Sequence, residues 1–262
     1  MTFRTVVDIP RPPFLIEPLE ELLFVGSCFA DNIGRRFQEE RFPVVVNPFG
    51  VMYNPASVLH TVQRCQSSAR ITFLTLGTNH VYRLKETGQI VDNCQKRPQQ
   101  LFQEEELSVA ACTDYLQQAV DQLQERRPDA QVVVTVSPIR YAKYGYHGSQ
   151  LSKATLLLAA HELARRNEGV TYFPAYEIVL DELRDYRFYQ PDMLHPSPQA
   201  VEYIWEQLSI HYLSPLAQQF VKDWQPIKAA LGHKPFQPDS DDYQQFLAQT
   251  RQKEKELLAR YA

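Results

Sequence analysis

The chain of 262 residues has no apolar run that approaches the length of a membrane span. A transmembrane helix needs about 18 or more consecutive, predominantly apolar residues. The first 24 residues contain several acids and prolines, and they lack the basic start and continuous apolar core of a signal peptide. We therefore expect no membrane association and a cytoplasmic location.

Blocks of like charge and metal or nucleotide motifs are also missing. The net charge is −4 and the Lys and Arg residues are dispersed, so a surface for nucleic acid is not predicted. The histidines show no metal-ligand spacing, and no Gly-rich phosphate loop is present. No CxxC pair occurs, and free thiols are expected for the four widely spaced cysteines, Cys28, Cys65, Cys94 and Cys112.

What the sequence does contain is an alternation of apolar strand segments with helical patterns. Helical spacing is clearest at Phe29, Ile33 and Phe37, from about Thr113 to Glu125, in residues 151–169, and after Ser197. Thr113 and Ser197 are the predicted N-caps of their helices. The predicted strands are 21–26, 42–50, 69–79, 130–138 and 169–179, the last with Pro174 inside it.

This alternation predicts a three-layer α/β/α fold with about five mostly parallel strands, of flavodoxin-like type. We assign residues 1–212 to this α/β domain. Residues 213–262 become polar and Gln-rich, and we expect a C-terminal helical extension there. Ligands of such sheets bind beyond the carboxyl ends of the strands.

The segment FVGSCFADNIG, residues 24–34, joins the first predicted strand to a helix. A residue at the tip of such a turn lies beside the unpaired N–H groups of the helix, which favour a thiolate or an oxyanion. Cys28 is therefore a candidate nucleophile. The alternative is that it packs as a small buried hydrophobe.

The segment PDMLHPS places Asp192 three residues before His195, in a loop that leads into a helix. A carboxylate at this spacing can accept the imidazole Nδ1–H, fix the tautomer and leave the other nitrogen as a base. The alternative is a surface pair that only shapes the loop.

Taken together, these motifs resemble the GSCFA family within the SGNH (GDSL-type) hydrolase superfamily. Further matching segments are NPFGVMYNP (47–55), TLGT (75–78), GQIVDNCQKRP (88–98), TVSPIR (135–140) and residues 172–197.

The resemblance implies a nucleophile at Cys28, the slot two residues after Gly26, with Ser27 as the alternative in a shifted register. It also implies that the Gly50 N–H and the Asn79 side chain stabilise an oxyanion. This sequence departs from the superfamily pattern in one more way, because the residue after that asparagine is a histidine, His80, rather than an aspartate.

The resemblance also implies an ester hydrolase or O-acyltransferase that acts on a small-molecule or carbohydrate ester. A thioester at a cysteine nucleophile slightly favours transfer. We expect no metal and no organic cofactor, although a transferase would use a donor such as acetyl-CoA. The rival hypotheses are a catalytically silent binding module and a scaffold whose C-terminal helix recruits a partner; the oligomeric state stays open.

Two further features have open interpretations. Arg140 lies beyond a predicted strand end, where it either supports the site or binds an anionic group of the substrate. The polar loop with Asn93, Cys94 and Lys96 either lines the pocket or stabilises the sheet edge.

Overall fold

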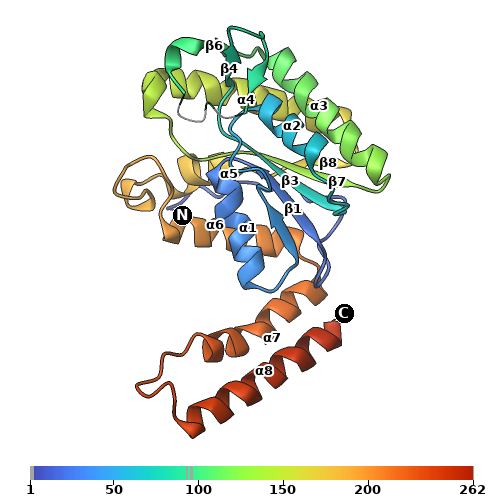
Figure 1. Ribbon diagram of the computed structural model, residues 1–262, viewed down its shortest axis with the longest axis vertical. Coiled ribbons are helices and arrows are strands. Elements are labelled where there is room, and N and C mark those ends of the chain that lie inside the picture. Colours follow the sequence, from blue (N-terminus) through green and yellow to red (C-terminus); the bar gives the residue numbers. More distant parts are fainter. Residues whose placement is uncertain (1–2, 93, 95–96, 262) are drawn as a thin grey trace.

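A computed structural model describes residues 3–92, 94 and 97–261. Its centre is a five-stranded parallel sheet with the order β2-β1-β3-β7-β8 (Figure 1). If only these five strands are counted in chain order, their order across the sheet is 2-1-3-4-5, which is that of flavodoxin-like folds. The predicted fold class is thus confirmed. The strands are β1 (Leu22–Gly26), β2 (Val44–Val46), β3 (Ile71–Leu76), β7 (Gln131–Val136) and β8 (Val170–Tyr172).

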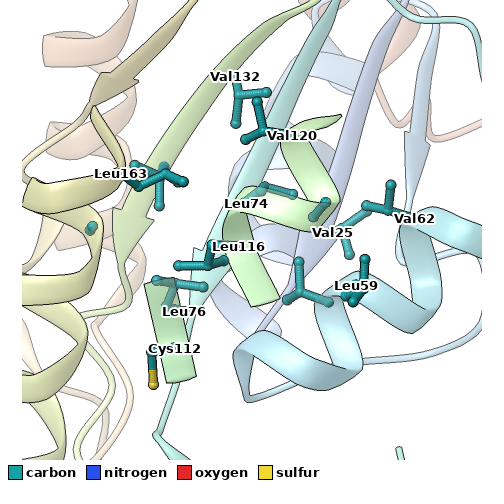
Figure 2. Packing of buried hydrophobic residues seen from close by; sticks show 14 of the residues in the cluster. Val25, Leu59, Val62, Leu74, Leu76, Cys112, Leu116, Val120, Val132 and Leu163 are labelled. Carbon is teal, nitrogen blue, oxygen red and sulfur yellow. The ribbon is translucent and has the colours of Figure 1, made fainter. Parts of the chain in front are cut away.

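Both faces of this sheet are covered, which explains why its strands are almost continuously apolar. On one face, alternate strand residues such as Val25, Leu74 and Val132 pack against three helices (Figure 2). These helices are α2 (Pro55–Arg64), α3 (Val109–Arg126) and α4 (Gly145–Arg166).

On the other face, Phe24 stacks on Phe73 with ring centroids 4.4 Å apart, and Phe37 meets Trp205 edge to face at 4.7 Å. This layer is built by α1 (Cys28–Glu39) and α6 (Pro198–Tyr212).

A second, antiparallel sheet follows β3, and the sequence analysis did not find it. Its strands are β4 (His80–Leu84), β5 (Ile90–Val91) and β6 (Phe102–Glu106), in the order β5-β4-β6. Most side chains of β6 are polar and exposed, so the strand lacks the apolar pattern on which the prediction relied. This small sheet stands beyond the end of β3, near the carboxyl edge of the main sheet (Figure 1).

Some boundaries differ from the prediction. Helix α3 begins four residues before Thr113, capped by Ser108, and the Thr113 hydroxyl donates to the Val109 carbonyl instead of capping. The predicted strand 169–179 ends at Tyr172. After Pro174 the chain becomes helical, because proline interrupts the ladder and fits a helix start. The remaining short helices are η1 (Gln99–Leu101), η2 (Ala142–Tyr144), α5 (Ala175–Glu177), η3 (Ile178–Leu183) and η4 (Tyr186–Phe188).

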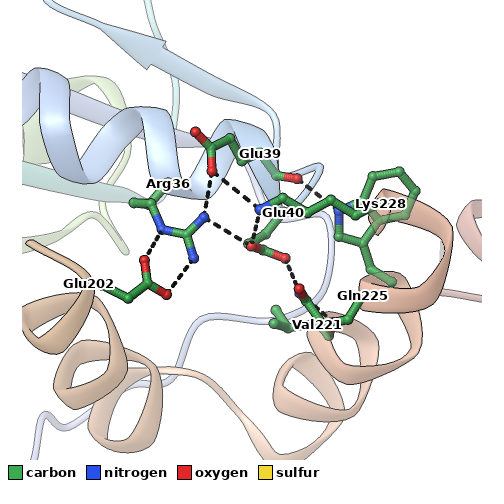
Figure 3. A network of polar contacts seen from close by, with 8 residues as sticks. Arg36, Glu39, Glu40, Glu202, Val221, Gln225 and Lys228 are labelled. Atoms are coloured by element: carbon green, nitrogen blue, oxygen red, sulfur yellow. Dashed lines mark hydrogen bonds and ion pairs between the residues drawn. The ribbon is translucent and has the colours of Figure 1, made fainter. Parts of the chain in front are cut away.

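The C-terminal extension is a helical hairpin of α7 (Pro215–Leu231) and α8 (Asp241–Tyr261), which projects from the body (Figure 1). Its base is held against α1, where the Trp224 indole N–H donates to the Glu39 carbonyl at 2.8 Å. The buried Glu40 carboxylate pairs with Arg36 and with Lys228 (Figure 3). A partly buried ion-pair network therefore fixes the hairpin to the α/β domain.

No helix in the described part of the chain combines the length and apolar character needed to cross a bilayer.

Candidate active site

The turn after β1 is shaped by a glycine and a helix cap. At Gly26 φ is +140°, and a Cβ there would lie 2.1 Å from the Thr75 carbonyl oxygen. Ser27 is completely buried, and its Oγ accepts from the Phe29 N–H and lies 3.1 Å from Thr75 Oγ1. Ser27 is thus the N-cap of α1. Cys28, the first residue of the helix, is only partly buried.

The surroundings of Cys28 act on its thiol in opposite directions. Burial raises the pKa of the thiol, the hydrogen bonds from the backbone N–H groups of Cys28 and Phe29 lower it, Asp31 raises it and the Lys153 ammonium lowers it. The net effect is a pKa above the ordinary thiol value. The resting state at neutral pH is therefore the thiol, and its use as a nucleophile requires a base.

Asn47 joins the backbone segments around this turn, a role that the sequence analysis missed. Its Oδ1 accepts from the Gly26 N–H at 2.8 Å, and its Nδ2 donates to Asp31 Oδ1 at 2.6 Å. Its carbonyl accepts the Gly50 N–H at 2.8 Å. The Gly50 N–H, an expected oxyanion donor, is thus engaged within its own turn. The available signal was the Asn47-Pro48 pair inside the predicted strand 42–50, which marks a turn.

The second expected oxyanion donor, Asn79, is buried and directly precedes β4. Its Nδ2 donates to the Leu107 carbonyl at 2.8 Å, and its backbone N–H donates to Ser152 Oγ at 3.0 Å. These bonds tie the start of β4 to the start of α3 and to α4.

Asp192 and His195 meet as their spacing suggests. His195 Nδ1 lies 2.6 Å from Asp192 Oδ2, and Asp192 Oδ1 accepts the backbone N–H groups of Leu194 and His195 at 2.9 and 3.0 Å. The backbone donors, followed by the imidazole, lower the pKa of Asp192 to about 2. The carboxylate therefore stays ionised at neutral pH and holds the proton on Nδ1, which leaves Nε2 as the basic nitrogen.

Arg140 fastens this loop to the sheet. Its Nη1 donates to the Met193 carbonyl and its backbone N–H to the Leu194 carbonyl, both at 3.0 Å. Its guanidinium also lies over the rings of Tyr146 and Tyr189. Because Arg140 follows β7, these contacts bring the Asp192–His195 loop to the carboxyl edge of the sheet.

Cys28 and His195 therefore reach the same sheet edge from different elements. Among the described residues, no hydrogen bond joins the Cys28 sulfur to the imidazole. Catalytic hydrogen bonds are often long in an enzyme without substrate. Their direct encounter stays a prediction.

Lys153 is a buried cation at this edge that the sequence analysis passed over within an apolar helix. Its side chain is almost completely buried, and Nζ donates to the carbonyls of Gly77 and Ser137, both at 2.7 Å. Burial lowers its pKa to about 7, and a thiolate at Cys28 would raise it. Within the described part of the chain, no carboxylate lies at ion-pair distance from it.

A cavity of about 280 Å³ opens between this edge and the small sheet. Tyr53 and Tyr141 form part of its wall, and a charge on Cys28 would raise the pKa of each phenol, which places both near the thiol. Cys94 also lines the cavity, whereas Asn93 and Lys96 lie outside the described residues. Other wall residues are Thr78, His80, Lys143 and Tyr144.

The fold and the site define a doubly wound α/β protein with a thiol and an Asp–His pair at the carboxyl edge of its sheet. The model of the GSCFA family matches residues 21–70 and 59–208, and that of the GSCFA domain protein, C-terminal domain, matches residues 224–262. The chain belongs to the GSCFA family. None of the curated proteins compared with the chain matches it.

The chain is also similar to several solved structures. TesA is 16% identical, with 75% of this chain and 99% of that chain covered and a TM-score of 0.47. A mutant acetyl esterase with an acetate ion is 12% identical, with 78% and 99% covered and a TM-score of 0.46. A carbohydrate esterase family 3 from Talaromyces cellulolyticus is 12% identical, with the same coverage and a TM-score of 0.45.

Proposed function

We propose that this GSCFA protein is an SGNH-type ester hydrolase or O-acyltransferase with Cys28 as its nucleophile. The observation that carries the proposal is the fixed Asp192–His195 pair, 2.6 Å apart, at the sheet edge where Cys28 begins α1. The choice of Cys28 over Ser27 is supported by the commitment of the buried serine hydroxyl to the helix cap.

The proposed reaction begins with proton transfer from Cys28 to His195 Nε2. This step is needed because burial raises the pKa of the thiol. The sulfur attacks the ester carbonyl, a C–S bond forms, and the carbonyl electron pair moves to oxygen. As the tetrahedral intermediate collapses, His195 donates its proton to the leaving alkoxide, and Asp192 stabilises the imidazolium throughout.

Release of the acyl group completes the reaction. His195 removes a proton from water or from a second alcohol, which attacks the thioester and regenerates the thiol. These steps require no metal and no organic cofactor, and in the transfer reaction the acyl donor itself can be a thioester such as acetyl-CoA.

The proposed substrate class is a small ester, including an acylated carbohydrate. The cavity between the sheet edge and the small sheet is lined by several aromatic side chains with polar tips and by a cation, Lys143. Aromatic rings beside hydrogen-bonding groups suit a ligand that presents both an apolar face and hydroxyl groups.

A panel of p-nitrophenyl esters and acetylated sugars, with and without acetyl-CoA, tests this proposal. Cys28→Ala and His195→Ala should each lower kcat/KM by at least about a hundredfold. Ser27→Ala is the matched control at the neighbouring position, and it should retain turnover. Loss of activity in Ser27→Ala but not in Cys28→Ala would refute the choice of nucleophile. Equal inactivity of the wild-type protein and all variants on every ester would refute the proposed function.

A further inference from the structure

The Tyr141 hydroxyl is a buried polar group without a hydrogen-bond partner among the described residues. Buried hydroxyl groups are nearly always paired, because leaving one unpaired costs free energy. This phenol therefore calls for an explanation.

Its position places the free hydroxyl at the candidate site. A Cβ on Gly77 would lie 2.4 Å from the Tyr141 oxygen, so the hydroxyl rests against the end of β3. The Tyr141 ring meets that of Tyr53 edge to face, 6.1 Å away, and both line the cavity. A thiolate at Cys28 would raise the pKa of Tyr141, so the phenol and the thiol lie within electrostatic reach of each other.

The protonation state of this phenol suits a donor. Burial, with a smaller contribution from the Cys28 charge, holds the pKa of Tyr141 well above its usual value. The group therefore keeps its proton at neutral pH and can donate a hydrogen bond. Lys153 Nζ lies 5.2 Å from the centre of the ring, where a cation makes the phenol a better donor.

Two of the expected donors are already engaged. The Gly50 N–H donates to the Asn47 carbonyl, and the Asn79 amide donates to the Leu107 carbonyl, both at 2.8 Å. The Tyr141 hydroxyl is thus an uncommitted donor against Gly77, at the sheet edge from which Cys28 begins α1.

We propose that Tyr141 is a further catalytic residue, whose hydroxyl donates a hydrogen bond to the oxyanion formed when Cys28 attacks an ester. The inference rests on the proposed function. In that step the C–S bond forms, the carbonyl pair becomes a lone pair on oxygen, and Tyr141 stabilises this charge without transferring its proton. The bond to the alkoxide then breaks and the carbonyl re-forms.

The test compares Tyr141→Phe with Tyr212→Phe, which removes the same oxygen from a buried ring packed on Phe14 and Phe173 in the core. Two reactions of Cys28 are followed by peptide mass mapping. Acetylation by p-nitrophenyl acetate forms an oxyanion, whereas alkylation by iodoacetamide displaces iodide and forms none.

Tyr141→Phe should slow acetylation by about 10²–10³-fold and leave alkylation unchanged, while Tyr212→Phe should change neither. Unchanged acetylation in Tyr141→Phe would overturn the inference while the proposed function stands. An equal fall in both reactions would also overturn it, because Tyr141 would then act through the thiol. Alkylation without acetylation in the wild-type protein would overturn the proposed function and this inference with it.

Discussion

Replacing Lys153 by methionine should remove a pH-dependent penalty from the folded state. The folded protein holds the pKa of this lysine at about 7, because the ammonium is buried. In the unfolded chain the pKa of this lysine returns to its ordinary value of 10.5. Between these values the unfolded state binds more protons than the folded state, so the free energy of unfolding rises with pH through this window.

The size of the effect follows from the two pKa values. At pH 7 a lysine with this shift costs the folded state about 4 kcal/mol, and at pH 9 about 2 kcal/mol. The free energy of unfolding of the wild-type protein should therefore rise by about 2 kcal/mol between pH 7 and pH 9 because of Lys153, and this rise should be absent in Lys153→Met. The thiols of Cys28 and Cys112, whose pKa values burial raises, act in the opposite direction at higher pH, but both proteins contain them.

Urea unfolding followed by circular dichroism at pH 7, 8 and 9 measures this difference. The absolute stability at one pH is less informative, because methionine also leaves the Gly77 and Ser137 carbonyls without their donor, at about 1–3 kcal/mol each. Lys234→Met, at an exposed position, is the matched control. If the wild-type and Lys153→Met curves run parallel across this pH range, the folded protein does not lower the pKa of Lys153 and the reasoning fails.

Three further substitutions test the turn and the hairpin. Gly26→Ala should lower the free energy of unfolding, measured in urea, by about 3 kcal/mol or more, because its Cβ would lie 2.1 Å from the Thr75 carbonyl oxygen at a positive φ. A near-neutral effect would contradict the described turn. Ser27→Ala should lower the free energy of unfolding by about 1–2 kcal/mol, because the helix loses its N-cap, and iodoacetamide should still label Cys28. Unaltered stability would argue against the cap. Glu40→Ala should lower the free energy of unfolding by about 2–3 kcal/mol and expose the α7–α8 hairpin to limited proteolysis, because it removes the buried carboxylate that Arg36 of α1 and Lys228 of α7 both contact. Glu40→Gln, which keeps the polar contacts, should cost less.

The features that the sequence predicted correctly depend on short-range patterns. Phe29, Ile33 and Phe37 are buried on one face of α1, as their spacing requires. Ser197 caps α6, because a hydroxyl followed by proline at the first helical position needs only local geometry. Asp192 and His195 meet for the same reason, since three residues of loop are enough to close their contact.

The missed elements lacked such a pattern or were overruled by a neighbour. The small sheet escaped because β6 is polar and short, and its pairing with β4 supplies hydrogen bonds rather than an apolar face. The strand expected through residue 179 ended early, because Pro174 cannot donate to the ladder.

The amino-acid sequence by itself determined the alternation of strands and helices, the capped start of α6 and the acid–histidine pair, because each depends on residues a few positions apart. Only the tertiary structure decided which polar groups share the sheet edge. Lys153 reaches the Gly77 carbonyl across 76 positions of chain, and the Tyr141 hydroxyl comes to rest against that same glycine. The order of the strands in the sheet brings these groups together, and that order cannot be predicted from the periodicity along the chain.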